Sequence, residues 1–245
     1  YFWKQDWDYF EFVVTGTDRL HHFHWGAVED QSHPFHDKAM DYYRRVDALI
    51  GEISGRLDGV GGSAASLFML SDHGFTGIET EVALNAWLAQ EGHLVFEAAS
   101  ERDLKNMAPS SRAFALDPNR IYINRRNRFP RGSVEDSDIP SLKADITSSL
   151  SNLEHNGRKV VRHVFDAAEI YHGPYAELGP DLVVLAEPGF DFKGSAGKKD
   201  VFGRTPGLEG MHTWDDAVFL APAECGGDIK ISDLAKIITS GYNIR

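Results

Sequence analysis

A carboxylate and an imidazole stand next to each other at the end of a predicted strand. Residues 67–71 are mostly apolar and predict a short strand buried on both faces, which Asp72, His73 and Gly74 follow directly. Carboxylate oxygens and imidazole nitrogens bind zinc and manganese, and ligands of open α/β sheets sit at such strand ends. Asp72 and His73 therefore make half of a metal site. A polar strand end that turns into a loop is the alternative reading.

A second carboxylate and imidazole follow another apolar segment. Residues 9–15 are rich in aromatic and β-branched side chains and predict a second buried strand. Asp18 and His22 come next, and on a helix beginning near Asp18 they would lie on one face, one turn apart. The two side chains could then share one cation. A surface patch made by His21, His22 and His24 is the alternative.

The elements around these motifs must bring them together. Apolar residues recur at helical spacing over residues 40–57 and predict an amphipathic helix between the two strands. A strand, a helix and a strand in this order predict a parallel crossover that places Asp18 and Asp72 at one edge of the sheet. Residues 181–186 and 217–221 read as further strands of the same sheet. We therefore expect an α/β fold with a mainly parallel central sheet, flanking helices and a smaller β-rich appended region.

The remaining pattern divides the chain into three segments. Other predicted elements are helices at 79–90, 139–155 and 232–240, a strand at 160–165, a hairpin at 112–124 and a long loop at 189–210. We expect residues 1–93 to form the metal-site part of the core, 94–158 an appended cap-like region, and 159–245 the return to the core. Arginines in 125–131 could meet an anionic substrate, but a solvated loop is the preferred interpretation.

Composition excludes several classes of protein. The chain has 37 acidic and 25 basic residues, a net charge of −12, which argues against a nucleic-acid polymer or an anionic membrane as partner. No apolar run approaches the roughly 20 residues of a membrane span. Cys225 is the single cysteine, so internal disulfides and cysteine-clustered zinc sites are excluded. The compartment stays open, with the cytoplasm preferred.

Several stretches, in order over nearly the whole chain, resemble the alkaline phosphatase superfamily, and most closely its type I phosphodiesterase/nucleotide pyrophosphatase family. They include Thr17-Asp18-Arg19-Leu20-His21-His22, Leu70-Ser71-Asp72-His73-Gly74-Phe75, Tyr122-Ile123-Asn124 and Gly210-Met211-His212-Thr213. The resemblance implies a hydrolase of small phosphate esters that uses two divalent metal ions, zinc first and manganese as the alternative. It implies that Asp18, His22 and His212 hold one ion, and that Asp72 and His73 hold the other.

The chain departs from the family pattern at its beginning. In the family, an earlier aspartate ligates the second ion, and a threonine or serine at a helix start attacks phosphorus. Only 17 residues precede Asp18, and none forms this arrangement. We therefore expect a fragment that is inactive alone, with the catalytic nucleophile on a missing N-terminal segment upstream of Tyr1. A phosphomutase of the same superfamily and a non-catalytic metal-binding domain are the alternatives, and Trp87 favours the hydrolase over the mutase.

Overall fold

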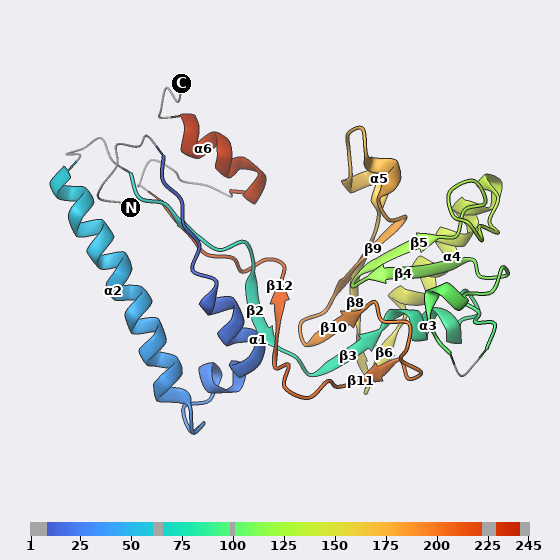
Figure 1. Ribbon diagram of the computed structural model, residues 1–245, viewed down its shortest axis with the longest axis horizontal. Coiled ribbons are helices and arrows are strands. Elements are labelled where there is room, and N and C mark those ends of the chain that lie inside the picture. Colours follow the sequence, from blue (N-terminus) through green and yellow to red (C-terminus); the bar gives the residue numbers. More distant parts are fainter. Residues whose placement is uncertain (1–8, 61–65, 99–100, 222–228, 241–245) are drawn as a thin grey trace. The chain divides into compact units, whose positions relative to one another are not determined.

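The computed structural model describes residues 9–60, 66–98, 101–221 and 229–240, in two compact units (Figure 1). Unit 1 comprises residues 1–77 and 207–245, and unit 2 comprises residues 78–206. The chain thus leaves unit 1, forms all of unit 2 and returns. Cys225 and the first eight residues lie outside the described part of the chain.

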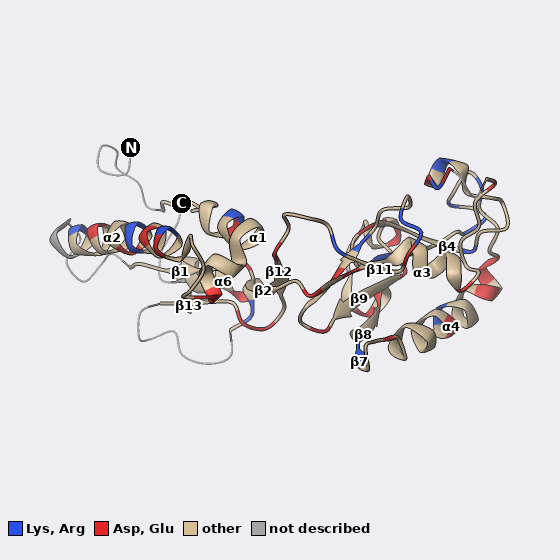
Figure 2. Cartoon of the chain, turned by 90° about the horizontal axis from the view of Figure 1, so that it is seen from below, with Lys and Arg blue, Asp and Glu red and all other residues tan. Residues whose placement is uncertain are grey.

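Two helices open unit 1. They are α1 (Gly16–Glu29) and α2 (His36–Val60), which pack against each other. The amphipathic helix predicted over residues 40–57 is confirmed by α2, along which acidic and basic positions alternate (Figure 2). The strand predicted over residues 9–15 is wrong, because this segment is irregular and its large side chains are mostly exposed. A β-prone composition forms a strand only where a neighbouring strand pairs with its backbone.

The strands of unit 1 form two short antiparallel pairs. They are β1 (Met69–Leu70) with β13 (Phe219–Leu220), and β2 (Gly74–Gly77) with β12 (Gly210–Thr213). In the second pair His212 lies opposite Phe75. The predicted parallel crossover between Asp18 and Asp72 is therefore wrong. The short helix α6 (Leu234–Ser240), after a 3-10 turn at Ile231–Asp233, confirms the predicted closing helix.

Unit 2 contains a four-stranded antiparallel sheet and a three-stranded sheet. The first has the order β4 (Ala113–Asp117), β5 (Arg120–Ile123), β9 (Leu182–Ala186) and β8 (Val161–Asp166). The second has the order β10 (Phe190–Lys193), β3 (Thr80–Ala83) and β11 (Phe202–Gly203). Its helices are α3 (Leu84–Gln90), α4 (Ile139–Ser151) and α5 (Ala167–Ile170), with 3-10 turns at Leu104–Asn106, Asp136–Asp138 and Ala176–Leu178 and a small hairpin of β6 (Glu154–His155) and β7 (Arg158–Lys159).

A continuous hydrophobic core fills unit 2. It includes Leu84 and Leu88 of α3, Leu142 of α4 and Phe192 of β10, each almost fully buried. Buried polar side chains in a core are stabilised by hydrogen bonds, and several in this core have them. Asn85, for example, donates to the carbonyls of Ala115 and Gly194 and accepts from the backbone N–H of Ala115.

The single mainly parallel sheet expected from the sequence is also wrong. The structure is a mixed α/β protein with several small sheets, and β3–β10 is the one parallel strand pair among the described residues. The segments 67–71 and 217–221 contain β1 and β13, which pair antiparallel, whereas β9 in 181–186 belongs to the separate four-stranded sheet. A short apolar run indicates that a strand forms, without indicating its partner or direction.

Several local predictions can be compared with the structure. The hairpin around Asp117-Pro118-Asn119 is confirmed by β4 and β5, with Asn119 at φ 67° in the turn. The helix expected at 79–90 begins only at Leu84, because β3 occupies the preceding residues, and the loop expected at 189–210 contains β10 and β11. The cap-like role of residues 94–158 stays a prediction. The two compact units have other boundaries along the chain, at residues 77/78 and 206/207. Within the described residues, no helix is both long and apolar enough to span a membrane.

The arginine-rich stretch 125–131 makes internal contacts of unit 2. Arg125 pairs with the fully buried carboxylate of Asp181, which also accepts a hydrogen bond from the backbone N–H of Ile123. The other arginines contact Glu135, Glu97 and the carbonyls of Met107, Leu178 and Gly179. These arginines therefore connect loops of unit 2 to one another and stabilise its fold.

Candidate metal centre

Helix α1 positions Asp18 and His22 on one face. Asp18 lies in the first turn, where a carboxylate is favoured by the helix dipole, and His22 lies one turn later with its Nε2 3.5 Å from Asp18 Oδ1. The neighbouring histidines turn away from this face. His21 contacts the hydroxyl of Tyr43, and His24 sits at a kink in the helix, at φ −143° and ψ 38°. The predicted one-turn spacing of Asp18 and His22 is confirmed.

Backbone contacts fasten α1 to the segment that carries His212. His22 Nδ1 donates to the Gly210 carbonyl at 2.9 Å, and the Glu209 N–H donates to the His22 carbonyl at 2.7 Å. A side chain at position 210 would collide with the His21 carbonyl, so glycine is required there. Because a carbonyl oxygen only accepts, Nδ1 carries the proton of a neutral His22. Its Nε2 then has a free lone pair for a metal ion.

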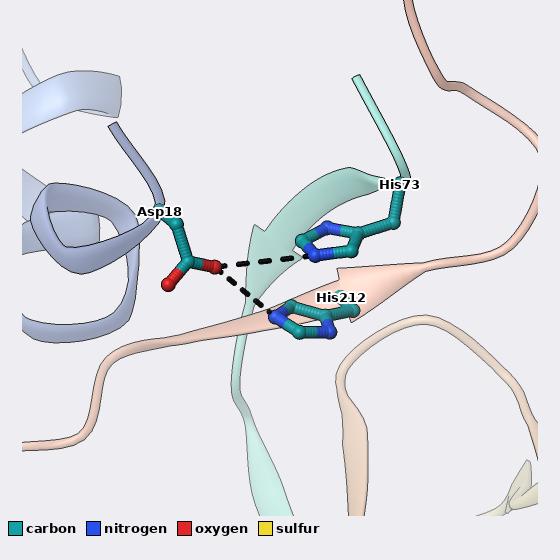
Figure 3. A group of neighbouring side chains, drawn as sticks. All are labelled: Asp18, His73 and His212. Atoms are coloured by element: carbon teal, nitrogen blue, oxygen red, sulfur yellow. Dashed lines mark hydrogen bonds and ion pairs between the residues drawn. The ribbon is translucent and has the colours of Figure 1, made fainter. Parts of the chain in front are cut away.

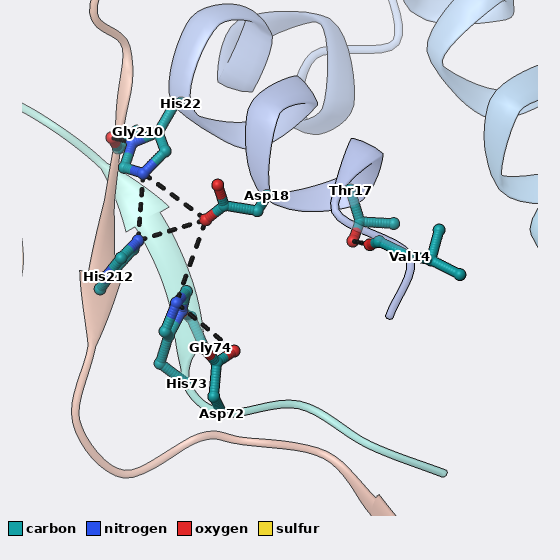
Figure 4. Close-up of polar contacts among 9 residues, drawn as sticks. All are labelled: Val14, Thr17, Asp18, His22, Asp72, His73, Gly74, Gly210 and His212. Atoms are coloured by element: carbon teal, nitrogen blue, oxygen red, sulfur yellow. Dashed lines mark hydrogen bonds and ion pairs between the residues drawn. The ribbon is translucent and has the colours of Figure 1, made fainter. Parts of the chain in front are cut away.

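Three ligand atoms form a triangle of the size that one ion requires (Figure 4). Asp18 Oδ1 lies 3.3 Å from His212 Nε2, and the His22 and His212 Nε2 atoms are 3.0 Å apart. With the 3.5 Å between Asp18 and His22, the edges span 3.0 to 3.5 Å. A tetrahedral zinc ion about 2.0–2.1 Å from each ligand separates them by roughly 3.3 Å. These residues therefore fit a single divalent ion.

His73 approaches the same carboxylate from the loop before β2. One ligand atom from each of Asp18, His73 and His212 lies within 4.8 Å of the other two (Figure 3). The His73 ring stacks on that of His212, with centroids 3.4 Å apart. Asp72 Oδ1 is 3.5 Å from His73 Nε2, but the Asp72 side chain is 77% exposed. All five predicted ligands thus gather in unit 1, and their division between two ions stays a prediction.

The surroundings of the half-exposed His212 favour its neutral form. Its pKa is lowered chiefly by burial, next by the neighbouring His73 and His22, against an opposing effect of Asp18. A lowered pKa favours the neutral imidazole at neutral pH. Neutral imidazole is the form that binds a metal ion.

Phe75 is a site residue that the sequence analysis missed. Its ring lies 4.8 to 5.5 Å, centroid to centroid, from the imidazoles of His21, His22, His73 and His212. Trp25 stacks on it at 6.1 Å. The ring therefore packs between the histidines and restricts their orientations. The sequence gives one indication of this role, because Phe75 directly follows Asp72-His73-Gly74. Its position opposite His212 depends on the pairing of β2 with β12.

One carboxylate and three imidazoles around a common point define a candidate divalent-metal centre on an α/β protein. The model of the type I phosphodiesterase / nucleotide pyrophosphatase family matches residues 2–215, so the chain belongs to this family and the predicted resemblance is confirmed. It is a hydrolase family that acts on small phosphate-ester substrates and typically uses divalent metals. A search of curated proteins returned no match.

Proposed function

We propose that this chain supplies the metal-binding part of a phosphodiesterase or nucleotide pyrophosphatase that works with two divalent ions. The triangle of 3.0 to 3.5 Å between the ligand atoms of Asp18, His22 and His212 carries the proposal. Asp18, His22 and His212 would hold the first ion, and Asp72 and His73 the second. Mixed carboxylate and imidazole ligands suit zinc, with manganese as the alternative.

The chain's own residues prepare the site for a phosphate ester. Phe75 and the Gly210 carbonyl hold the imidazoles in position, and the lowered pKa of His212 favours the neutral imidazole that can bind an ion. When bound, two divalent ions supply Lewis acids that offset charge on the phosphoryl oxygens and stabilise the attacking and leaving oxygens.

The attacking nucleophile is proposed to come from a segment outside these 245 residues. Three hydroxyls adjoin the ligands within the described chain, and each is engaged elsewhere; the Ser71 hydroxyl beside Asp72 accepts a hydrogen bond from the Val218 N–H at 2.9 Å. Thr17 Oγ1 donates to the Val14 carbonyl at 3.1 Å, and the Thr213 hydroxyl donates to Asp216. Catalytic zinc normally has three protein ligands, whereas Asp72 and His73 provide two. Both points support a chain that binds metal but turns over no ester by itself.

Zinc titration of two histidine variants tests the ligand set. His22→Ala should weaken zinc binding at least about tenfold, because it removes one of three ligands. His24→Ala is the matched control from the same helix, and its affinity should equal that of the unchanged chain. Calorimetry gives both constants, and equal losses would contradict the assignment.

An assay of bis(p-nitrophenyl) phosphate with added zinc tests the reaction. The 245-residue chain should release no nitrophenol above the zinc control, and a longer chain that includes the upstream segment should release it. Comparable turnover by both chains would show that a Ser or Thr within the 245 residues attacks. Turnover by neither would favour the phosphomutase or the non-catalytic metal-binding domain.

A further inference from the structure

The three-stranded sheet of unit 2 has one apolar face and one polar face. Val82, Phe192 and Phe202 lie on the apolar face and belong to the core or pack against it. On the other face, the register places Glu81 of the central strand between Asp191 and Gly203. Glu81 is nevertheless only 4% exposed. A carboxylate is therefore buried on a face where solvation would be expected.

The two oxygens of Glu81 have different surroundings. Oε2 accepts a hydrogen bond from Thr205 Oγ1 at 2.6 Å, whereas Oε1 is buried and accepts none. The nearest cation, Lys193 Nζ, is 3.8 Å from Oε1 and is held by Asp191 Oδ2 at 2.5 Å. A buried carboxylate oxygen without a hydrogen-bond donor raises the free energy of the folded state. A ligand that donates a hydrogen bond to Oε1 would remove this penalty.

A cavity of about 180 Å³ opens beside Glu81. It has room for about six waters, or for one small sugar-sized molecule. The space in front of Gly203 is open, because a Cβ at this position would meet no atom within 4 Å. Its other lining residues are Ala83, Lys193, Lys198, Lys199, Asp200, Val201, Phe202 and Arg204. The exposed cations among them give this part of an acidic protein a positive rim.

We propose that this cavity binds a hydroxyl-bearing anion of the sugar-phosphate class. A ligand hydroxyl would donate to Glu81 Oε1, and the phosphate would lie against Lys198, Lys199 and Arg204. The ammonium of Lys193, next to both Asp191 and Glu81, argues against a metal cation in the cavity. Every lining residue belongs to unit 2, so this site shares no residue with the metal ligands of unit 1.

Calorimetry with ribose 5-phosphate tests the proposal on the 245-residue chain in the presence of a chelator. Ribose 5-phosphate should bind, and ribose alone and inorganic phosphate alone should each bind at least about tenfold more weakly, because each keeps one half of the contacts. Inorganic phosphate binding as tightly as ribose 5-phosphate would overturn the role of Glu81. No binding of ribose 5-phosphate would overturn the site, leaving water as the donor to Oε1.

Two variants locate the binding in the cavity. Glu81→Gln should weaken ribose 5-phosphate binding about tenfold without weakening inorganic phosphate. Gly203→Val places a side chain in the open space beside Glu81 and keeps the Glu81 carboxylate, and it should abolish ribose 5-phosphate binding while the urea midpoint stays unchanged. The Gly203 variant therefore still tests the proposal if the Glu81 variant fails to fold.

Lysine variants complete the test. Lys199→Met should weaken binding, whereas Lys159→Met, at an exposed position of β7, is the matched control and should not. Unchanged ribose 5-phosphate binding in Gly203→Val, or equal losses in the two lysine variants, would contradict the proposal.

Discussion

The two units of this protein divide packing from chemistry. Unit 2 holds a continuous core from Val82 to Val201, whereas the buried hydrophobic residues described in unit 1 are Ala27, Ala39 and Ile53. Unit 1 holds all five candidate metal ligands, and contacts such as His22 with Gly210 and Phe75 with the histidines connect its elements. Apolar burial stabilises unit 2, and we infer that a bound ion contributes much of the stability of unit 1.

The largest expected effect comes from the core of unit 2. Leu88→Ala should lower the free energy of unfolding by about 2–5 kcal/mol, because it opens a cavity at a fully buried position. Leu178→Ala is the matched control at a 70% exposed position and should change the same quantity by less than about 0.5 kcal/mol. Urea denaturation measures both. Similar decreases in the free energy of unfolding for the two variants would contradict a stabilising role for the core of unit 2.

Zinc binding should stabilise unit 1 and leave unit 2 unchanged. At a zinc concentration about 100 times the Kd, linkage stabilises the folded form by about 2.7 kcal/mol. Hydrogen exchange followed by mass spectrometry should show this protection in α1 and β12 of unit 1. Exchange in α3 and β4 of unit 2 should not change. Equal protection of all four elements would contradict the division of roles.

A smaller, pH-dependent effect belongs to unit 2. The pKa of His93 is lowered chiefly by burial and also by Arg112, against Asp145 and Glu91. The unfolded chain therefore binds a proton more readily than the folded chain, and stability falls as the pH drops below about 6.5. His93→Gln should reduce the fall in urea midpoint between pH 7.5 and 5.5. The exposed His172→Gln is the control, and an equal reduction in both would refute a role for buried His93.

The sequence predicted local features better than their assembly. The spacing of Asp18 and His22 follows from helix geometry alone, and the turn at Asn119 follows from local backbone preferences. The pairing of β2 with β12 joins segments more than 130 residues apart, and no local pattern specifies it. For the same reason the contacts of Phe75 could not be predicted.

The burial of two carboxylates was also beyond the sequence. Asp181 and Glu81 look like ordinary polar positions of short strands, yet both are buried by segments distant in sequence. Asp181 depends on Arg125, 56 residues away, and Glu81 on Thr205, 124 residues away. Such burial depends on tertiary packing, which neither strand propensity nor charge pattern reports.

Anomalous diffraction from crystals of the zinc-loaded chain tests the central claim most directly, because it locates the ion and its ligands together. The structure predicts a zinc peak roughly 2.0–2.2 Å from Asp18 Oδ1, His22 Nε2 and His212 Nε2. A peak bound by His73 and His212 without His22, or one away from this cluster, would contradict the proposed centre.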